Sequence, residues 1–136
     1  MIASGRAGRW NEDHQKVIYA SSSRALASLE LLVHRSAIRP SFSYKVMVIE
    51  ARVGDGDIEK LKTDDLPENW RTLLAYHYLQ KTGSQWYQKK SSLLLQVPSV
   101  IVPYEFNLII NTTHRDFLKK IRLLRLENHF WDNRLI

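Results

Sequence analysis

The stretch "SGRAGRWNEDHQKVIYASSSRALASLELLVH", residues 4–34, decides most of what this chain can become. It opens with a glycine-broken loop that carries Arg6 and Arg9, continues into a short apolar run that includes Tyr19, and closes with a helical pattern that contains Glu30. A carboxylate within the apolar stripe of a helix is unfavourable unless it has a partner or a task. The sequence therefore directs attention to Glu30 and to the cations and the aromatic ring just before it.

The second half of this stretch predicts a strand followed directly by a helix. The run "KVIYA" at 16–20 favours a strand, and "SSSRALASLELLVHRS" at 21–36 favours a helix that Ser22 or Ser23 can cap. The buried stripe of this helix is expected to consist of Leu26, Leu29 and Val33. Because successive helical residues are rotated by about 100°, Glu30 falls at the edge of that stripe or inside it.

The rest of the chain mixes strand and helix patterns. Apolar strands are expected at 43–53, 92–103 and 105–114. The first is apolar on both faces, which is typical of a central strand, and Pro98 interrupts the second. A helix is expected within 73–85, where Gly83 can end it. The last twenty residues fit a helix or a strand equally well, and a few helices with five or six strands indicate an α+β fold.

The composition is that of one ordinary globular domain. The chain has 136 residues, 44% of them hydrophobic and 25% charged, so 1–136 is expected to be a single domain with 1–7 as a loop or a frayed terminus. Its apolar runs are too short to cross a bilayer, and its first residues lack the pattern of a signal peptide. Because it has no cysteine, disulfides and thiolate chemistry are excluded. The cytoplasm is the expected location.

The net charge of +6 favours an anionic partner, such as nucleic acid, a phosphate-bearing small molecule or an acidic protein. Lysines and arginines are scattered along the chain, so a mildly basic, solvated surface explains the charge equally well. The aromatic residues do not interleave with basic ones as they do in a stacking platform for nucleic acid.

The charged residues of the opening stretch each have a structural and a functional interpretation. Glu30 can turn outward and pair with an arginine such as Arg24 or Arg35, or it can face a cleft and stabilise developing positive charge there. Arg6 and Arg9 can belong to a flexible loop, or they can bind phosphate oxygens together with backbone amides that the neighbouring glycines leave accessible. Periodicity alone leaves these alternatives open.

Two uncharged residues are candidates for orienting a ligand. Tyr19 lies at the junction of strand and helix, where a side chain can point into a pocket, and a packing role is the alternative. Ser99 is the only hydroxyl between Val97 and Pro103, so it either bonds to the backbone at a proline bulge or orients a ligand. The five histidines lack the H-x-x-x-H and H-E-x-x-H spacings of zinc sites, so no metal is expected.

Five short motifs occur in a fixed order along the chain. They are "GRWN" at 8–11, "VIYAS" at 17–21, "ALASLELLVH" at 25–34, "VPSVIVPYEFNLIIN" at 97–111 and "FWDNRL" at 130–135. Together they resemble the RES domain, the toxin half of bacterial Xre–RES type II toxin–antitoxin modules, over essentially residues 5–136. Members of that family usually carry an additional strand and loop before "GRWN", where this chain has residues 1–7.

The resemblance implies a fold like that of ADP-ribosyltransferase toxins, a split β-sandwich with flanking helices, and it implies NAD as the substrate. Carried over residue by residue, it implies that the catalytic residues are Glu30, Arg9, Tyr19 and Ser99. It implies that Arg9, Tyr19, Ser99 and, less securely in its spacing, Arg6 bind NAD. Glu30 would then face the ribosyl cation, the arginines the pyrophosphate, Tyr19 the nicotinamide ring, and Ser99 the ribose or the amide.

The activity that the resemblance implies is NAD degradation by cleavage of the nicotinamide–ribose bond, through hydrolysis or phosphorolysis, with growth arrest as the result. A protein ADP-ribosyltransferase acting on a host protein would use the same residues, and a non-enzymatic basic binding module is a third reading. The leaving group is already cationic, so the reaction requires no metal. The implied partner is an Xre-type antitoxin with a helix-turn-helix DNA-binding domain, and a toxin homodimer can form within that complex. Direct contact with nucleic acid or membrane is not expected.

Overall fold

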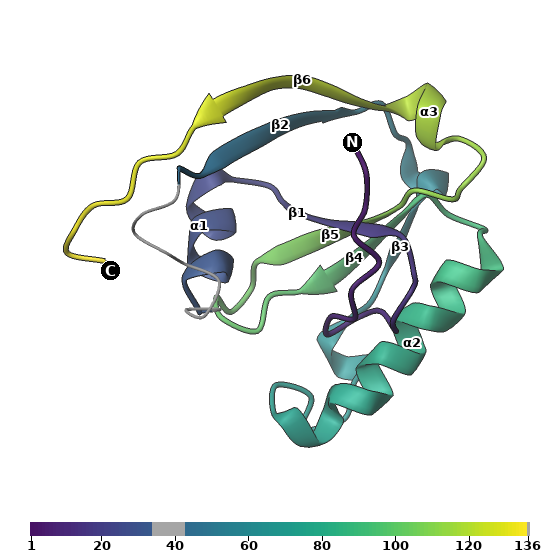
Figure 1. Cartoon of the computed structure of the whole chain (residues 1–136). Helices are drawn as coiled ribbons and strands as arrows, with labels where there is room; N and C mark the ends of the chain where they lie inside the picture. Colours follow the sequence, from purple (N-terminus) through teal and green to yellow (C-terminus); the bar gives the residue numbers. More distant parts are fainter. Residues whose placement is uncertain (34–42, 136) are drawn as a thin grey trace.

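The computed structural model of the chain describes residues 1–33 and 43–135, which form two facing β-sheets flanked by helices (Figure 1). The larger sheet has the strand order β1 (Val17–Ser21), β5 (Phe106–Asn111), β4 (Leu94–Pro98) and β3 (Ile58–Lys60). The smaller sheet consists of β2 (Lys45–Ala51) and β6 (Ile121–Asn128). The helices are α1 (Arg24–Val33), α2 (Tyr76–Lys89) and α3 (Phe117–Lys120), with 3₁₀ turns at Asp55–Asp57, Thr63–Asp65 and Leu73–Ala75. The predicted α+β class and split β-sandwich are confirmed.

The larger sheet buries a different apolar cluster on each of its faces. Successive side chains of a strand point to opposite faces, so Tyr19 and Ser21 of β1 share a face with their partners Ile109 and Asn107 of β5. The cluster on this face, under α2 and the N-terminal loop, consists of Trp10, Val17, Trp70, Ala75, Leu79, Trp86, Leu95, Val97 and Ile109. The cluster toward the smaller sheet consists of Leu93, Leu94, Ile110, Phe117 and Ile121. The first face is the one that carries the polar pair Ser21 and Asn107.

The expectation that Gly83 ends the second helix is wrong. Helix α2 continues to Lys89, and Lys90, in the left-handed conformation with φ of 53°, ends it. Gly83 is buried in the middle of α2, where the helix crosses the backbone of Trp10 so closely that an added Cβ would lie 1.7 Å from the Trp10 carbonyl oxygen. Glycine is therefore required there for close approach and not for a turn.

The C-terminal segment, which the pattern left open between helix and strand, contains both. A single turn of helix, α3, is followed at once by β6, because β2 offers the second half of the segment a strand to pair with. The register of this pair shifts between Val48 and Ile49, which marks a β-bulge at the middle of the small sheet.

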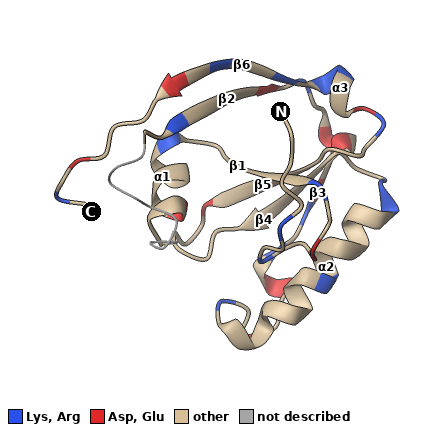
Figure 2. Cartoon of the chain, viewed as in Figure 1, with Lys and Arg blue, Asp and Glu red and all other residues tan. Residues whose placement is uncertain are grey.

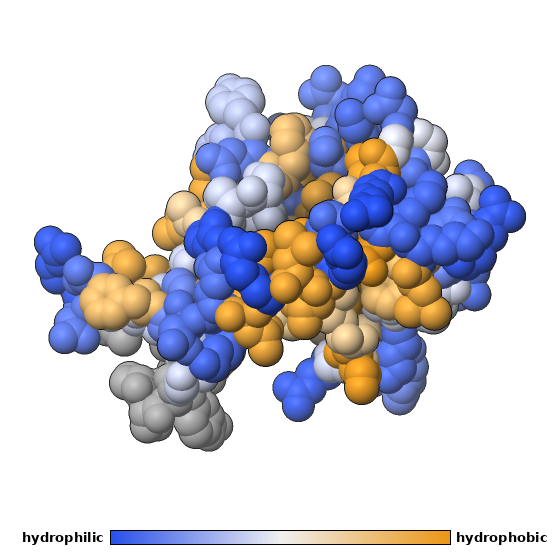
Figure 3. All heavy atoms as spheres, turned by 90° about the horizontal axis from the view of Figure 1, so that it is seen from above, coloured by the Kyte–Doolittle hydropathy of each residue, from blue (hydrophilic) through white to orange (hydrophobic). Residues whose placement is uncertain are grey.

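The expectation that the 43–53 segment forms a central strand is wrong. In the described part of the chain β2 pairs with β6 alone, so both strands lie at sheet edges. Apolar side chains on this small sheet that remain exposed are Met47, Leu123, Leu124 and Leu126. Figure 3 looks down on this layer and shows apolar side chains in the middle of the face with hydrophilic ones around them.

Helix α1 begins as predicted, because the hydroxyl of Ser23 accepts the backbone N–H of Leu26 at 3.1 Å. The predicted apolar stripe of this helix is only partly correct. Leu26 is buried as expected, but the other two members of the stripe are exposed, Leu29 to 40% and Val33 to 61%. The half-buried Glu30 lies one turn after Leu26 and on the same side of the helix. The predicted end of the helix at 34–36 lies outside the described residues.

Lysine and arginine residues occur on β2, β6, α2 and α3 and on the N-terminal loop (Figure 2). Arg24 donates two hydrogen bonds to the carboxylate of Glu127, at 2.9 and 2.7 Å, and thereby ties the start of α1 to β6. These bonds, with one from Arg125, lower the pKa of Glu127 to about 2.

Within residues 1–33 and 43–135, no helix combines the length and the apolar character needed to cross a membrane.

Candidate active site

A cavity of about 620 Å³ lies where the N-terminal loop, β1, α1 and the start of α2 meet. The predicted site residues on its wall are Arg6, Arg9, Tyr19 and Glu30. Residues of β1, β4, β5 and the start of α2 complete the wall, among them Ser21, Val97, Asn107 and Tyr76. The volume is within the range of about 300–1,000 Å³ that is usual for small-molecule sites.

From the described residues, the carboxylate of Glu30 accepts two hydrogen bonds, both at the same oxygen. Oε1 accepts the hydroxyl of Ser99 at 2.9 Å and the side-chain amide N–H of Asn107 at 2.5 Å. Of the two arginines proposed as structural partners, Arg24 is bound to Glu127, and Arg35 lies outside the described residues. The buried side of α1 therefore presents Glu30 to polar groups of the sheet.

Ser99 is 1% exposed and lies just after Pro98, the last residue of β4. Its hydroxyl oxygen accepts the backbone N–H groups of Ile101 and Val102, at 3.2 and 3.1 Å, while its proton goes to Glu30. The structural interpretation of this serine is confirmed, since it bonds to the backbone at a proline turn, while its role in orienting a ligand stays a prediction. The group it contacts is the carboxylate of Glu30.

Tyr19 fixes the N-terminal loop to the sheet. Its hydroxyl donates to Asn11 Oδ1 at 2.7 Å and accepts the backbone N–H of Trp10 at 3.0 Å. Burial of the hydroxyl raises the pKa of Tyr19 well above its ordinary value. The residue as a whole is 45% exposed and lines the cavity, so a buried hydroxyl is combined with a ring that a ligand can reach.

Replacing Tyr19 by phenylalanine is expected to reduce the free energy of unfolding by about 1–3 kcal/mol, because the N–H of Trp10 and Oδ1 of Asn11 lose their common partner. Because the pKa of Tyr19 is raised in the folded chain, the stability that this residue contributes also depends on pH. That contribution is complete below about pH 10, the pH near which tyrosine ionises in the unfolded chain, and it is lost as the pH rises further. Urea unfolding at pH 8 and pH 10.5 measures both effects.

The half-exposed Tyr78 provides the matched control, since Tyr78→Phe removes the same atom from α2 outside the loop. Equal stability of the Tyr19 and Tyr78 variants at pH 8, or an equal loss above pH 10 in parent and Tyr19→Phe, would contradict the assigned role of the hydroxyl.

The two arginines differ in how firmly they are held. The Arg9 guanidinium lies 5.5 Å from the centre of the Tyr76 ring and donates to the carbonyl of Trp70 at 3.4 Å, so it is positioned at the start of α2. Arg6 is exposed, and its backbone carbonyl accepts the amide of Asn11. The loop between them is anchored and supplies fixed positive charge to one side of the cavity.

Four residues of the site were missed by the sequence interpretation. They are Asn11, Ser21, Tyr76 and Asn107. An asparagine in the otherwise apolar run "FNLII" was a usable signal for Asn107, since an isolated polar residue in a buried strand needs a partner. Nothing in the sequence indicated Tyr76, which reaches the cavity only because α2 packs on the N-terminal loop.

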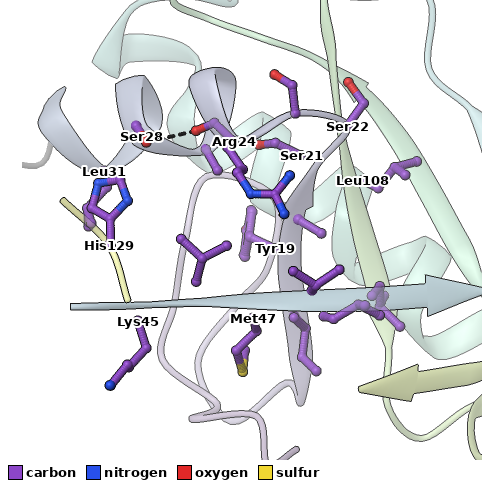
Figure 4. Close-up of a pocket in the computed structure, with 18 of the residues that line it drawn as sticks. Tyr19, Ser21, Ser22, Arg24, Ser28, Leu31, Lys45, Met47, Leu108 and His129 are labelled. Atoms are coloured by element: carbon purple, nitrogen blue, oxygen red, sulfur yellow. Dashed lines mark hydrogen bonds between the residues drawn. The ribbon is translucent and has the colours of Figure 1, made fainter. Parts of the chain in front are cut away.

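A second cavity of about 500 Å³ lies between the sheets on the other side of β1 (Figure 4). Arg24 extends into it from the start of α1, Lys45 and Met47 come from β2, and His129 follows β6. Its lining is mainly apolar and does not include Arg6, Arg9, Glu30 or Ser99. In the ranges that the structure describes, no cluster of three or more His, Asp or Glu is suited to hold a metal ion.

Comparison with known proteins identifies the family. The RES domain family matches residues 2–132. The chain is 41% identical over 133 residues to "Prs ADP-ribosylating toxin" of Sphingobium sp. (strain YBL2), covering 95% of this chain and 80% of that protein. It is 39% identical over 110 residues to "Toxin Res" of Yersinia enterocolitica, covering 81% and 71%. It is 33% identical over 129 residues to "Toxin Res" of Photorhabdus laumondii, covering 95% and 81%. A match over nearly the whole chain and this degree of identity to proteins named as toxins show that the chain belongs to the RES-domain family of enzymatic toxins.

Proposed function

We propose that this toxin cleaves the bond between nicotinamide and ribose in NAD and passes the ADP-ribosyl group to water, so that NAD is depleted. The observation that carries the proposal is the carboxylate of Glu30, held by two donors at a cavity that also contains two arginines and two tyrosines. A fixed negative charge beside cationic and aromatic groups suits a ligand with a diphosphate, a cationic ring and a ribose between them.

The binding roles follow from where the side chains lie. Arg9, fixed against Tyr76 and Trp70, and the exposed Arg6 are proposed to bind the diphosphate. Tyr19 offers the exposed face of its ring to the nicotinamide, while its hydroxyl stays engaged with the loop. Ser99 is proposed to act through Glu30, because its buried hydroxyl is already bonded to that carboxylate.

The chemistry that this arrangement supports is a dissociative substitution at C1′ of the ribose. The C1′–N bond breaks, its electron pair goes to the ring nitrogen, and nicotinamide leaves as a neutral molecule. The ribosyl group then carries oxocarbenium-like positive charge, which Glu30 stabilises from nearby. Water adds to C1′ and releases a proton, so the products are nicotinamide, ADP-ribose and one proton.

Transfer of ADP-ribose to a protein is the second candidate function. The observation in its favour is the Sphingobium relative, whose name describes a toxin that ADP-ribosylates Prs. The first step at C1′ and the residues proposed for it are the same in both cases. Only the nucleophile that captures the ribosyl cation differs.

An antitoxin partner is also proposed, because the family resemblance is to the toxin half of Xre–RES modules. The basic loop with Arg6 and Arg9 at the cavity suits an acidic or carboxylate-ended segment of such a partner. Binding there would prevent NAD from entering.

Incubating the purified chain with NAD is expected to release nicotinamide and free ADP-ribose in equal amounts, as measured by chromatography. Hydrolysis predicts that both products form without any protein present except the toxin. Labelled NAD added to a cell lysate then tests the second candidate, which predicts label in one protein band and nicotinamide release that depends on that protein. If nicotinamide appears under neither condition, cleavage of NAD is not the activity of this site.

A further inference from the structure

Asn107 and Ser21 form a polar pair in an apolar part of the larger sheet. They lie directly opposite each other in the antiparallel pair of β1 and β5, with their side chains on the face that lines the cavity. The neighbours of Asn107 on that face, Val97 and Ile109, are 2% and 0% exposed. An amide in such a setting needs defined partners for both of its ends.

The two ends of this amide have different partners. Oδ1 of Asn107 accepts the hydroxyl of Ser21 at 2.6 Å, and Nδ2 donates to Oε1 of Glu30 at 2.5 Å. Because a carboxylate only accepts hydrogen bonds, the N–H group of the amide is turned toward Glu30, and the hydroxyl of Ser21 holds the oxygen end of the amide against β1. Ser99 approaches the same oxygen from the turn after β4, with a hydroxyl that two backbone N–H groups fix in turn.

We propose that Asn107, oriented by Ser21, is a positioning residue that keeps the side-chain carboxyl group of Glu30 in one place at the cavity wall. The proposal rests on the NAD-cleaving function proposed above, since only a reaction at a fixed carbon needs a fixed charge. A glutamate has three rotatable side-chain bonds, and a displacement of about 1 Å from the productive position can lower a rate by about 100-fold. One donor from strand β5 and one from the turn after β4 remove that freedom before the substrate binds.

The test replaces Asn107 by aspartate, which has nearly the same shape and places a second carboxyl against Glu30. Two carboxyls this close cannot both ionise readily, so they share one proton, and the protonated new side chain can still donate to Glu30. As the pH rises the second proton leaves, and repulsion between the two carboxylates then displaces Glu30. Among the residues that the structure describes, the other ionisable side chains on this cavity are Arg6, Arg9, Tyr19 and Tyr76, so none of them is a carboxyl or a histidine.

The expected result is that kcat of Asn107→Asp falls by about 10-fold or more between pH 5.5 and pH 8.5, while kcat of the parent stays flat and KM for NAD changes less than 3-fold. Ser21→Ala, which frees the amide to rotate, is expected to lower kcat by about 3- to 10-fold with KM unchanged. The exposed Asn133 supplies the matched control, since Asn133→Asp adds the same charge outside the cavity and should keep the parental pH profile.

A parallel pH profile for Asn107→Asp and the parent would overturn the proposal, and so would a rise in KM at constant kcat, which would make Asn107 a substrate-binding residue. Carbon-13 NMR of the Glu30 carboxyl gives a readout that does not depend on turnover. Its titration should shift upward in Asn107→Asp, and an unchanged titration contradicts the contact. If the parent releases no nicotinamide while this shift is present, the proposed function fails and the contact stands.

Discussion

Glu30→Gln is expected to lower the rate of nicotinamide release by about 100- to 1,000-fold, which is the usual effect of removing one fixed electrostatic group from an active site. The charge is lost but the shape is kept. The amide oxygen of glutamine can accept the same hydrogen bonds from Ser99 and Asn107 that Oε1 of the carboxylate accepts. The fold should therefore remain, and the effect should appear in kcat and not in the unfolding temperature.

The measurement is nicotinamide release by parent and variant side by side, together with thermal unfolding of both. Glu68→Gln is the control, because Glu68 is exposed and the change removes the same charge away from the cavity. In bacteria, expression of Glu30→Gln should no longer arrest growth. A variant that releases nicotinamide at the parental rate removes Glu30 from the proposed mechanism.

Gly83→Ala is expected to be the most destabilising of the glycine-to-alanine changes in this chain. The new Cβ would lie 1.7 Å from the backbone oxygen of Trp10, and a backbone carbonyl cannot move aside as a side chain can. Overpacking of this kind costs about 1–3 kcal/mol and more where backbone shifts, whereas alanine regains only about 1 kcal/mol of helix propensity. A net loss of about 2 kcal/mol lowers the unfolding temperature of a domain of this size by about 6–10 °C.

This change should also affect the site, because α2 and the loop are connected at several points. Gln80 donates to the carbonyl of Gly8, and Gln15 donates to Ser84. If α2 moves away from Trp10, Arg9 moves with the loop, so KM for NAD should rise by more than the change in kcat. Gly56→Ala is the control, since a Cβ there meets no atom within 4 Å, and its unfolding temperature should match the parent. Equal melting of the two alanine variants would refute the close approach.

The sequence indicated the candidate site residues, and the structure added the contacts on which their proposed roles depend. The order of the motifs indicated Arg9, Tyr19, Glu30 and Ser99, and the first three line one cavity with Arg6. Their contacts changed what each is proposed to do. Ser99 reaches Glu30 and lies outside the cavity wall, and the hydroxyl of Tyr19 is used to hold the loop. Such assignments depend on distances across 69 residues of sequence in the case of Ser99 and Glu30, which no local pattern contains.

The sequence by itself determined the α+β class, most strand positions, a serine cap at Ser22 or Ser23 and the candidate residues, because periodicity, capping and motif order act over a few residues at a time. Tertiary structure decided what those patterns leave open. It made β2 an edge strand, let α2 run past Gly83, and brought Asn107 opposite Ser21 and against Glu30. The physical reason is that burial and hydrogen bonding are satisfied between segments far apart in the chain, so the partner of a polar residue is known only once the strands have paired.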